Sequence, residues 1–188
     1  MQGWFASDRP STIADLNEVF GERTFAIGIA LLMAPTALPI PTGGLTHIFE
    51  VISVILSLEL IAGRRTPWLP KKLQQRKLPA DGKFAEGVIR WLARIERFTR
   101  PRFERTLRSR AAGPIYGAIA LVLIVIAAIA PPFSGLDTLP GLGVVLVSLG
   151  MIFGDALFVI AGMAIGAAGA VLIAFLGQQA VDLFQKIF

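Results

Sequence analysis

Five ionisable residues stand in or beside otherwise apolar stretches of this 188-residue sequence. An ionisable side chain within a membrane segment destabilises the folded protein by several kcal/mol unless it is paired or reaches water, so such a residue is a functional candidate by default. The five residues are Glu50, Glu59, Asp137, Asp155 and His47, the last being the sole histidine of the chain.

Two of the carboxylates also have simpler structural explanations. Glu59 lies within reach of Arg64 or Arg65, so an interfacial salt bridge is expected there. Glu50 begins the second arm of an apolar hairpin, where a carboxylate favours the positive end of a helix. Both residues therefore remain open between a structural and a functional role.

The other three candidates are likewise ambiguous. Asp137, with Thr138, can cap the helix that follows it, and Asp155 can cap the final helix after Gly154. His47 lies in a loop, where a lone histidine is more often a surface residue than a ligand.

The sequence offers little for catalysis. One histidine and no cysteine cannot supply a zinc-type ligand set without carboxylates doing most of the binding. No GxSxG or Walker loop is present, and the only Ser/His pairing is Ser53 or Ser57 with His47, close in sequence alone. We therefore assign no catalytic residue, no metal and no cofactor.

The composition is that of a membrane protein. Its mean hydropathy of +0.67 and apolar fraction of 54% exceed those of an ordinary soluble domain. The first 23 residues join no basic segment to an apolar stretch, so we expect no cleavable signal there.

An internal repeat organises the chain. Each half carries two short apolar arms joined by an elbow rich in proline and glycine, and one register without gaps aligns the two halves. Sliding the sequence by 91 places sets Pro41 on Pro132, Gly44 on Gly135, Ser57 on Ser148 and Gly63 on Gly154.

These features predict an all-α integral membrane protein forming a single domain. It contains a two-fold repeat of short, broken helical hairpins, which either span the membrane or are re-entrant, a basic amphipathic connector and one full-length transmembrane helix. The predicted parts are an interfacial N-terminal helix (1–23), hairpin 1 (24–63), the connector (64–112), hairpin 2 (113–154), the transmembrane helix (155–177) and a tail (178–188).

The two elbows are the expected binding site. Discontinuous segments in matching positions of two repeats leave free backbone ends near the repeat interface, where membrane transporters bind their ligands. The candidate ligand-binding residues are Pro41, Gly43, Gly44, His47, Glu50, Glu59, Pro132, Gly135 and Asp137.

The connector carries most of the positive charge. Residues 64–110 hold 15 of the 18 lysines and arginines against four acids, so the positive-inside rule predicts that the connector is cytoplasmic. We expect it to contact anionic lipid headgroups and not nucleic acid. The candidate phosphate-binding residues are Arg64, Arg65, Lys71 and Lys72.

The last apolar segment carries small residues at four-residue spacing. Gly162, Gly166 and Ala170 share one face, and small residues allow close helix packing in lipid. This face predicts either a homodimer or packing inside the monomer.

Several stretches of the sequence resemble the ExoD family of bacterial exopolysaccharide-synthesis membrane proteins. The most specific are GRRTPWLP and ARIERFTRPR, and the likeness extends over residues 18–177. The resemblance implies an inner-membrane protein linked to exopolysaccharide production and carries over no catalytic residue.

Three classes of function follow from these observations. The first is binding or translocation of a lipid-linked or anionic intermediate, and the second is a scaffold or regulator docking on polysaccharide synthesis machinery. The third is an intramembrane enzyme using Glu50, Glu59 or Asp137.

Overall fold

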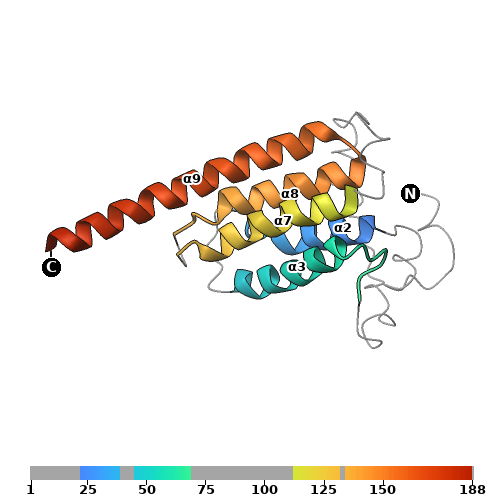
Figure 1. Cartoon of the computed structure of the whole chain (residues 1–188), viewed down its shortest axis with the longest axis horizontal. Helices are drawn as coiled ribbons and strands as arrows, with labels where there is room; N and C mark the ends of the chain where they lie inside the picture. The colour runs from blue at the N-terminus through green and yellow to red at the C-terminus, as the bar shows by residue number, and fades with distance from the viewer. Residues whose placement is uncertain (1–21, 39–44, 69–111, 132–133, 188) are drawn as a thin grey trace.

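The structure, a computed structural model, describes residues 22–38, 45–68, 112–131 and 134–187 (Figure 1). The described residues form five helices and no strand, which confirms the all-α prediction. The predicted N-terminal helix and most of the basic connector lie outside the described residues. The helices are α2 (Arg23–Met33), α3 (Leu45–Ile61), α7 (Ala112–Ile129), α8 (Thr138–Phe153) and α9 (Ala156–Ile187).

Local sequence signals set several helix ends. Pro35 has no N–H to donate to the preceding turn, and α2 ends at Met33 just before it. Gly154 closes α8 in the left-handed conformation, with φ of 69°. Asp155 then accepts a hydrogen bond from the Leu157 N–H at 3.0 Å, which confirms its predicted role as a cap of α9.

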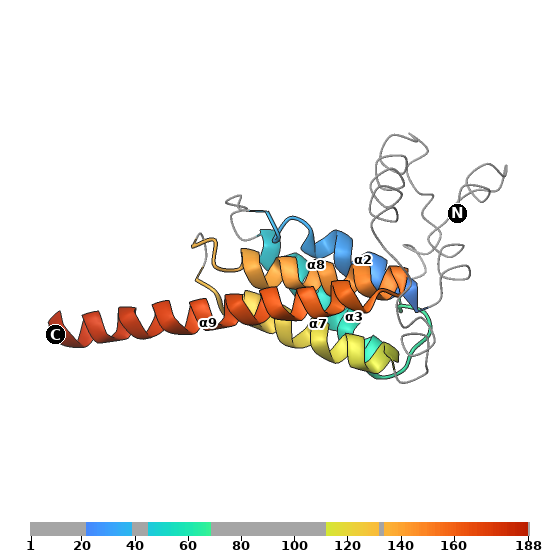
Figure 2. The same cartoon turned by 90° about the horizontal axis from the view of Figure 1, so that it is seen from above.

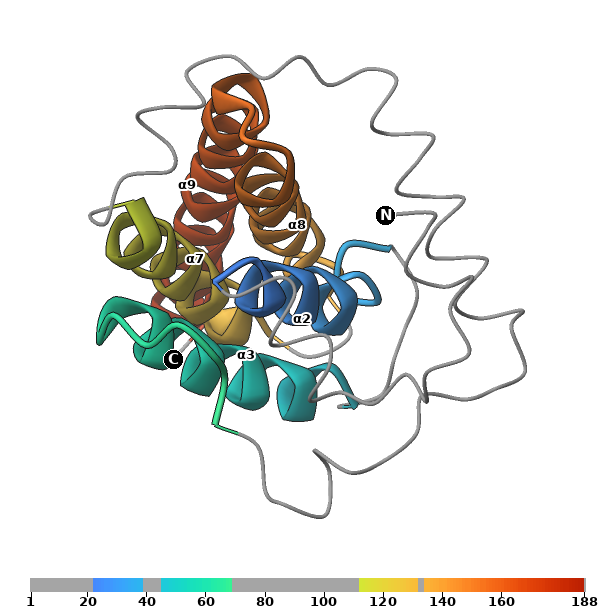
Figure 3. The same cartoon turned by 90° about the vertical axis from the view of Figure 1, so that its right-hand side faces the viewer.

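Four helices form a closed ring in which each packs on two neighbours. α3 packs against α2 and α7, and α8 packs against the same two helices (Figure 3). α9 packs mainly on α8 and lies on the side of the bundle opposite α3.

The two hairpins run in parallel. α2 and α7 run in one direction and α3 and α8 return, so both elbows lie at the same end of the bundle (Figures 1 and 2). We call this the elbow end, and the end where α3 stops and α7 starts the connector end. α9 runs from the connector end and extends past the elbow end towards the C-terminus.

The helices that the 91-residue shift aligns take comparable places in the bundle, while the repeat itself stays a prediction. The shift of 91 residues places α3 on α8 and places α2 within α7. It also exchanges the α3–α7 contact with the α8–α2 contact, so the ring is consistent with a two-fold axis along the bundle. Gly63 and Gly154, which the shift aligns, both adopt φ near +70°.

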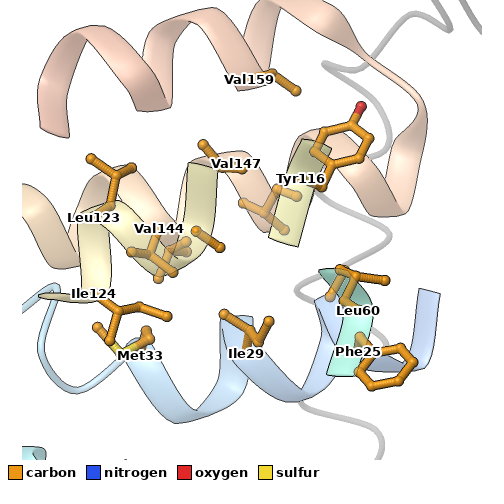
Figure 4. Packing of buried hydrophobic residues seen from close by; sticks show 14 of the residues in the cluster. Phe25, Ile29, Met33, Leu60, Tyr116, Leu123, Ile124, Val144, Val147 and Val159 are labelled. Carbon is orange, nitrogen blue, oxygen red and sulfur yellow. The ribbon is translucent and has the colours of Figure 1, made fainter. Parts of the chain in front are cut away.

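The core is apolar and draws on every helix of the ring (Figure 4). Phe25, Ile29 and Met33 of α2 are fully buried, as are Ile124 of α7 and Val144 of α8. Close backbone contact joins α8 to α9, because Gly143 and Gly162 each stand where an added Cβ would lie under 3 Å from the other's carbonyl oxygen.

The structure sets the bounds of the last two helices. α8 begins at Thr138, and Pro140 fits within its first turn. α9 continues to Ile187, through most of the predicted tail, because no proline interrupts the final stretch.

Two of the described helices are long and apolar enough to cross a membrane. They are Ala112–Ile129 and the Ala156–Gln179 part of α9. The shorter α2, at about 16 Å by helical rise, covers about half of a typical hydrocarbon core. The re-entrant nature of the hairpins stays a prediction.

Candidate functional site

The inner face of α3 is polar. Thr46, Glu50, Ser53 and Ser57 are all buried, and their spacing of four, three and four residues places them on one side of the helix. We call these four residues the polar stripe.

The outer face of the same helix is apolar. Its exposed fractions range from 41% to 60%, so α3 reverses the usual pattern of a helix in a water-soluble protein. The exposed residues are Ile48, Val51, Ile52, Ile55 and Leu58.

Glu50 is the centre of the polar stripe. The residue is 2% exposed, and its Oε2 lies 2.8 Å from Nδ1 of His47, one turn earlier. His47 lies within α3, so its predicted place in a loop is wrong, because the helix begins at Leu45. Its Oε1 is buried and has no hydrogen-bond partner within the described part of the chain. The His47 side chain is 43% exposed, so the pair connects the surface at the elbow end with the interior.

The hydroxyl groups below Glu50 are also unsatisfied. Ser53 and Ser57 are fully buried, and neither Oγ has a hydrogen-bond partner among the described residues. Thr36 Oγ1, in the turn after α2, and the Tyr116 hydroxyl of α7 also have no hydrogen-bond partner among the described residues. Buried polar atoms without partners are infrequent in folded proteins, and each one calls for an explanation such as an unseen water, ion or ligand.

The side chains of the polar stripe and His47 suit the binding of protons or polar groups better than the binding of a metal ion. No group of three His, Cys, Asp or Glu side chains that could hold a metal ion occurs among the described residues. His47 and Glu50 together offer two ligands, whereas the serine hydroxyls can donate and accept hydrogen bonds.

The binding site at the elbows stays a prediction. Pro41, Gly43, Gly44 and Pro132 lie outside the described residues. In the second elbow, Gly135 adopts a φ of 69°.

The second elbow is closed by its own hydrogen bonds. Ser134 Oγ donates to the Pro131 carbonyl at 2.6 Å and accepts from the Leu136 N–H at 3.2 Å. Asp137 occupies the N-cap position of α8 without a capping hydrogen bond from its side chain, so the predicted capping bond is absent.

Glu59 has the structural role expected of it. Its Oε1 accepts a hydrogen bond from Arg64 at 3.0 Å, and its Oε2 accepts the Trp68 N–H at 2.9 Å. Nine residues separate Glu59 from Glu50, about 13 Å along a helix, so the two carboxylates do not share a site.

The predicted phosphate-binding residues fall in two groups. Arg64 and Arg65 are exposed just after α3, at the connector end. Lys71 and Lys72 lie outside the described residues. The structure thus separates these arginines from the His47–Glu50 pair by the length of α3.

The small residues of α9 pack inside the chain. Gly162 meets Gly143 and Val147 of α8, and Gly166 meets Leu123 of α7. Ala170 is only half-buried. Of the two alternatives for this glycine face, the structure shows packing within the monomer, and a homodimer stays a prediction.

Sequence reasoning did not group Ser53 and Ser57 with Glu50. The signal was present in their spacing of three and seven residues from Glu50, which places all three on one helix face. Thr36 and Tyr116 were not singled out, and nothing in their local sequence distinguishes them.

Comparisons with known proteins agree with the resemblance noted in the sequence. A family model described as exopolysaccharide synthesis, ExoD, matches residues 4–175. Protein ExoD of Rhizobium meliloti is 31% identical over 189 residues, covering 96% of this chain and 77% of the relative. An uncharacterized protein of Synechocystis sp. is 30% identical over 170 residues, covering 85% and 76% respectively.

No solved structure matches the chain. The family model nevertheless spans most of its length, and the identity to protein ExoD extends over nearly all of it. The chain therefore belongs to the ExoD family of exopolysaccharide synthesis proteins.

Proposed function

We propose that the chain is a multi-pass inner-membrane protein that binds or translocates a lipid-linked or anionic intermediate of exopolysaccharide synthesis. The observation that carries this proposal is the reversed polarity of α3, with a buried polar stripe and an exposed apolar face. Family membership supports the link to exopolysaccharide synthesis.

The reversed polarity favours a lipid environment. In water, five exposed aliphatic side chains on one helix would form an apolar patch, whereas hydrocarbon accommodates them without loss. Polar and ionisable residues inside membrane bundles face the interior and mark pathways for substrates or ions. The polar stripe has this placement.

The ends of the bundle suggest how an anionic headgroup would be held. Arg64 forms a salt bridge with Glu59, whereas the neighbouring Arg65 is exposed at the connector end. Arginine suits phosphate recognition because its planar guanidinium can donate two parallel hydrogen bonds. A phosphate headgroup would bind there, at the membrane surface beside the connector end.

Binding can be tested in vesicles. The purified full-length protein is reconstituted with a fluorescent polyprenyl phosphate, and binding and flipping are compared with empty vesicles. We expect both signals with the wild type, and about tenfold weaker binding in Arg65→Gln through loss of a charged hydrogen bond. Neither binding nor flipping above the level of empty vesicles would overturn the proposal.

The orientation can be tested by cysteine labelling. With the basic connector on the cytoplasmic side, the elbow end and Gln178 lie outside. Because the sequence has no native cysteine, a single Gln178→Cys change gives one label site. A membrane-impermeant maleimide should label Gln178→Cys in intact cells and should label Thr66→Cys only after permeabilisation. The reverse pattern would contradict the assigned orientation.

A scaffold for polysaccharide synthesis machinery is the second candidate. It is favoured by the outer face of α9, where Val171 and Phe175 are more than half exposed. Crosslinking through a photoreactive residue at position 175 in native membranes should then recover a synthase subunit. Recovery of lipid adducts alone would remove this candidate.

A further inference from the structure

We infer that His47 and Glu50 form a proton-binding pair inside the membrane, open to water only at the elbow end. This inference rests on the proposed membrane function, because it assigns a coupling ion to the same bundle. In it, His47 exchanges protons with water, and Glu50 holds the proton inside.

The geometry suits proton transfer between the two residues. Nδ1 of His47 and Oε2 of Glu50 are 2.8 Å apart, which is hydrogen-bonding distance. The histidine side chain is 43% exposed and the glutamate side chain 3%. A proton from water binds at Nε2 of His47. The Nδ1–H bond of His47 then breaks, and the proton released from Nδ1 forms a bond to Oε2 of Glu50.

Among the described residues of α2, α3 and α7, no other charged side chain lies near this pair to balance its charge. α3 packs against α2 and α7, and the ionisable side chains of these two helices are Glu22, Arg23 and Tyr116, all near the connector end. Glu59 of α3 is already paired with Arg64.

In this proposal the pair shares one proton. When the shared proton is on the Glu50 carboxyl group, both side chains are neutral. When it is on the His47 imidazole, the two side chains form a close ion pair. Loss of that proton would leave an uncompensated carboxylate in an apolar interior, which is strongly unfavourable.

The polar stripe gives the proton site one closed end. The hydroxyl groups of Ser53 and Ser57 continue from Glu50 over roughly 10 Å of helix, and both are without partners among the described residues. Beyond them Leu60 is 2% exposed and fills the interior. Access from one side only is what a coupling site requires, because a path open at both ends would leak protons.

The state of Glu50 can be read by chemical labelling. Dicyclohexylcarbodiimide is apolar and reacts with protonated carboxyl groups: the proton moves to a carbodiimide nitrogen, and the carboxylate oxygen bonds to the central carbon. The wild-type protein in vesicles at neutral pH is treated and analysed by peptide mass spectrometry. We expect an adduct on Glu50 and none on Glu59, and Glu50→Gln should abolish it.

A second measurement tests the entry role of His47. Infrared spectra of the reconstituted protein follow hydrogen–deuterium exchange at the protonated Glu50 carboxyl, identified by its loss in Glu50→Gln. Exchange should slow at least tenfold in His47→Phe, while Glu59→Gln, a matched change on the same helix, should leave the rate unchanged. The thermal unfolding midpoint of each variant confirms that it is folded.

The results separate this inference from the proposed function. No Glu50 adduct, equal labelling of Glu50 and Glu59, or an unchanged exchange rate in His47→Phe would overturn the proton-binding pair, even if polyprenyl phosphate still binds. Conversely, a labelled Glu50 without lipid binding would retain the proton site and remove the proposed ligand class.

Discussion

The two hairpins share a backbone plan and differ in the chemistry of their inner faces. A glycine with φ near +70° follows each of the second helices, α3 and α8. Each of these two helices packs on the first helix of the other hairpin. The 91-residue shift nevertheless places Gly141 where α3 has Glu50, and Val144 where it has Ser53. At these two positions the first hairpin therefore carries polar groups where the second carries packing residues, whereas Ser57 aligns with another buried serine, Ser148.

The outer faces differ as well. At one aligned position, α8 has Gly143 and α3 has Ile52. The glycine allows α9 to approach until the two backbones are in contact, whereas Ile52 is 41% exposed and uncovered. The same backbone arrangement thus carries the candidate site in the first hairpin and the packing surface for α9 in the second.

The largest effect should come from filling the α8–α9 contact. In Gly143→Ala the new Cβ would lie 2.7 Å from the Gly162 carbonyl oxygen, a backbone atom that cannot move without shifting α9. We expect a loss of about 3 kcal/mol in unfolding free energy, measured by denaturation in detergent. Gly177→Ala, in the same helix as Gly162 but in open space, should be neutral or stabilising by up to about 1 kcal/mol. Equal stability of the two variants would show that the contact is looser than described.

The next effect should come from making the second hairpin chemically like the first. Val144→Ser introduces a hydroxyl at a position that is fully buried among apolar neighbours. The expected destabilisation is about 2 kcal/mol, because on folding the new hydroxyl group loses its hydrogen bonds to water and gains no hydrogen-bond partner in the core. A thermal unfolding midpoint equal to that of the wild type would mean that the second hairpin tolerates polarity as the first does.

A smaller effect should test the shared backbone plan. Gly63 has a φ of 72° and no atoms near a built Cβ, so Gly63→Ala isolates the strain of the left-handed conformation. We expect a loss of about 1 kcal/mol in unfolding free energy. Gly63→Asn, which tolerates this conformation better, should recover part of it. If both variants match the wild type, the left-handed turn is not essential to the first hairpin.

The smallest effect should have the opposite sign. Ser53→Val gives α3 the residue found at the aligned position of α8 and replaces a buried hydroxyl without a described partner. We expect a gain of about 1 kcal/mol in stability, since an unsatisfied buried group is removed. A clear destabilisation would indicate that Ser53 has a partner in the folded protein. In that case the polar stripe would contribute to folding as well as to the site.

The sequence by itself determined the local features of this protein. Apolar run length and the positions of proline and glycine indicated where the helices of the two hairpins lie. The Glu59–Arg64 salt bridge and the Asp155 cap join residues close in sequence, so local spacing was sufficient to predict them. Where a local rule failed, as with the missing side-chain cap at Asp137, the difference was confined to one hydrogen bond.

The tertiary structure decided which faces point inward. Helical spacing puts Glu50, Ser53 and Ser57 on one side of α3, but it does not say whether that side meets the core, lipid or water. Packing against α2 and α7 buries it, and packing of α9 on α8 consumes the glycine face inside the chain. The physical reason is that periodicity is a property of one helix, whereas burial depends on which neighbours surround it.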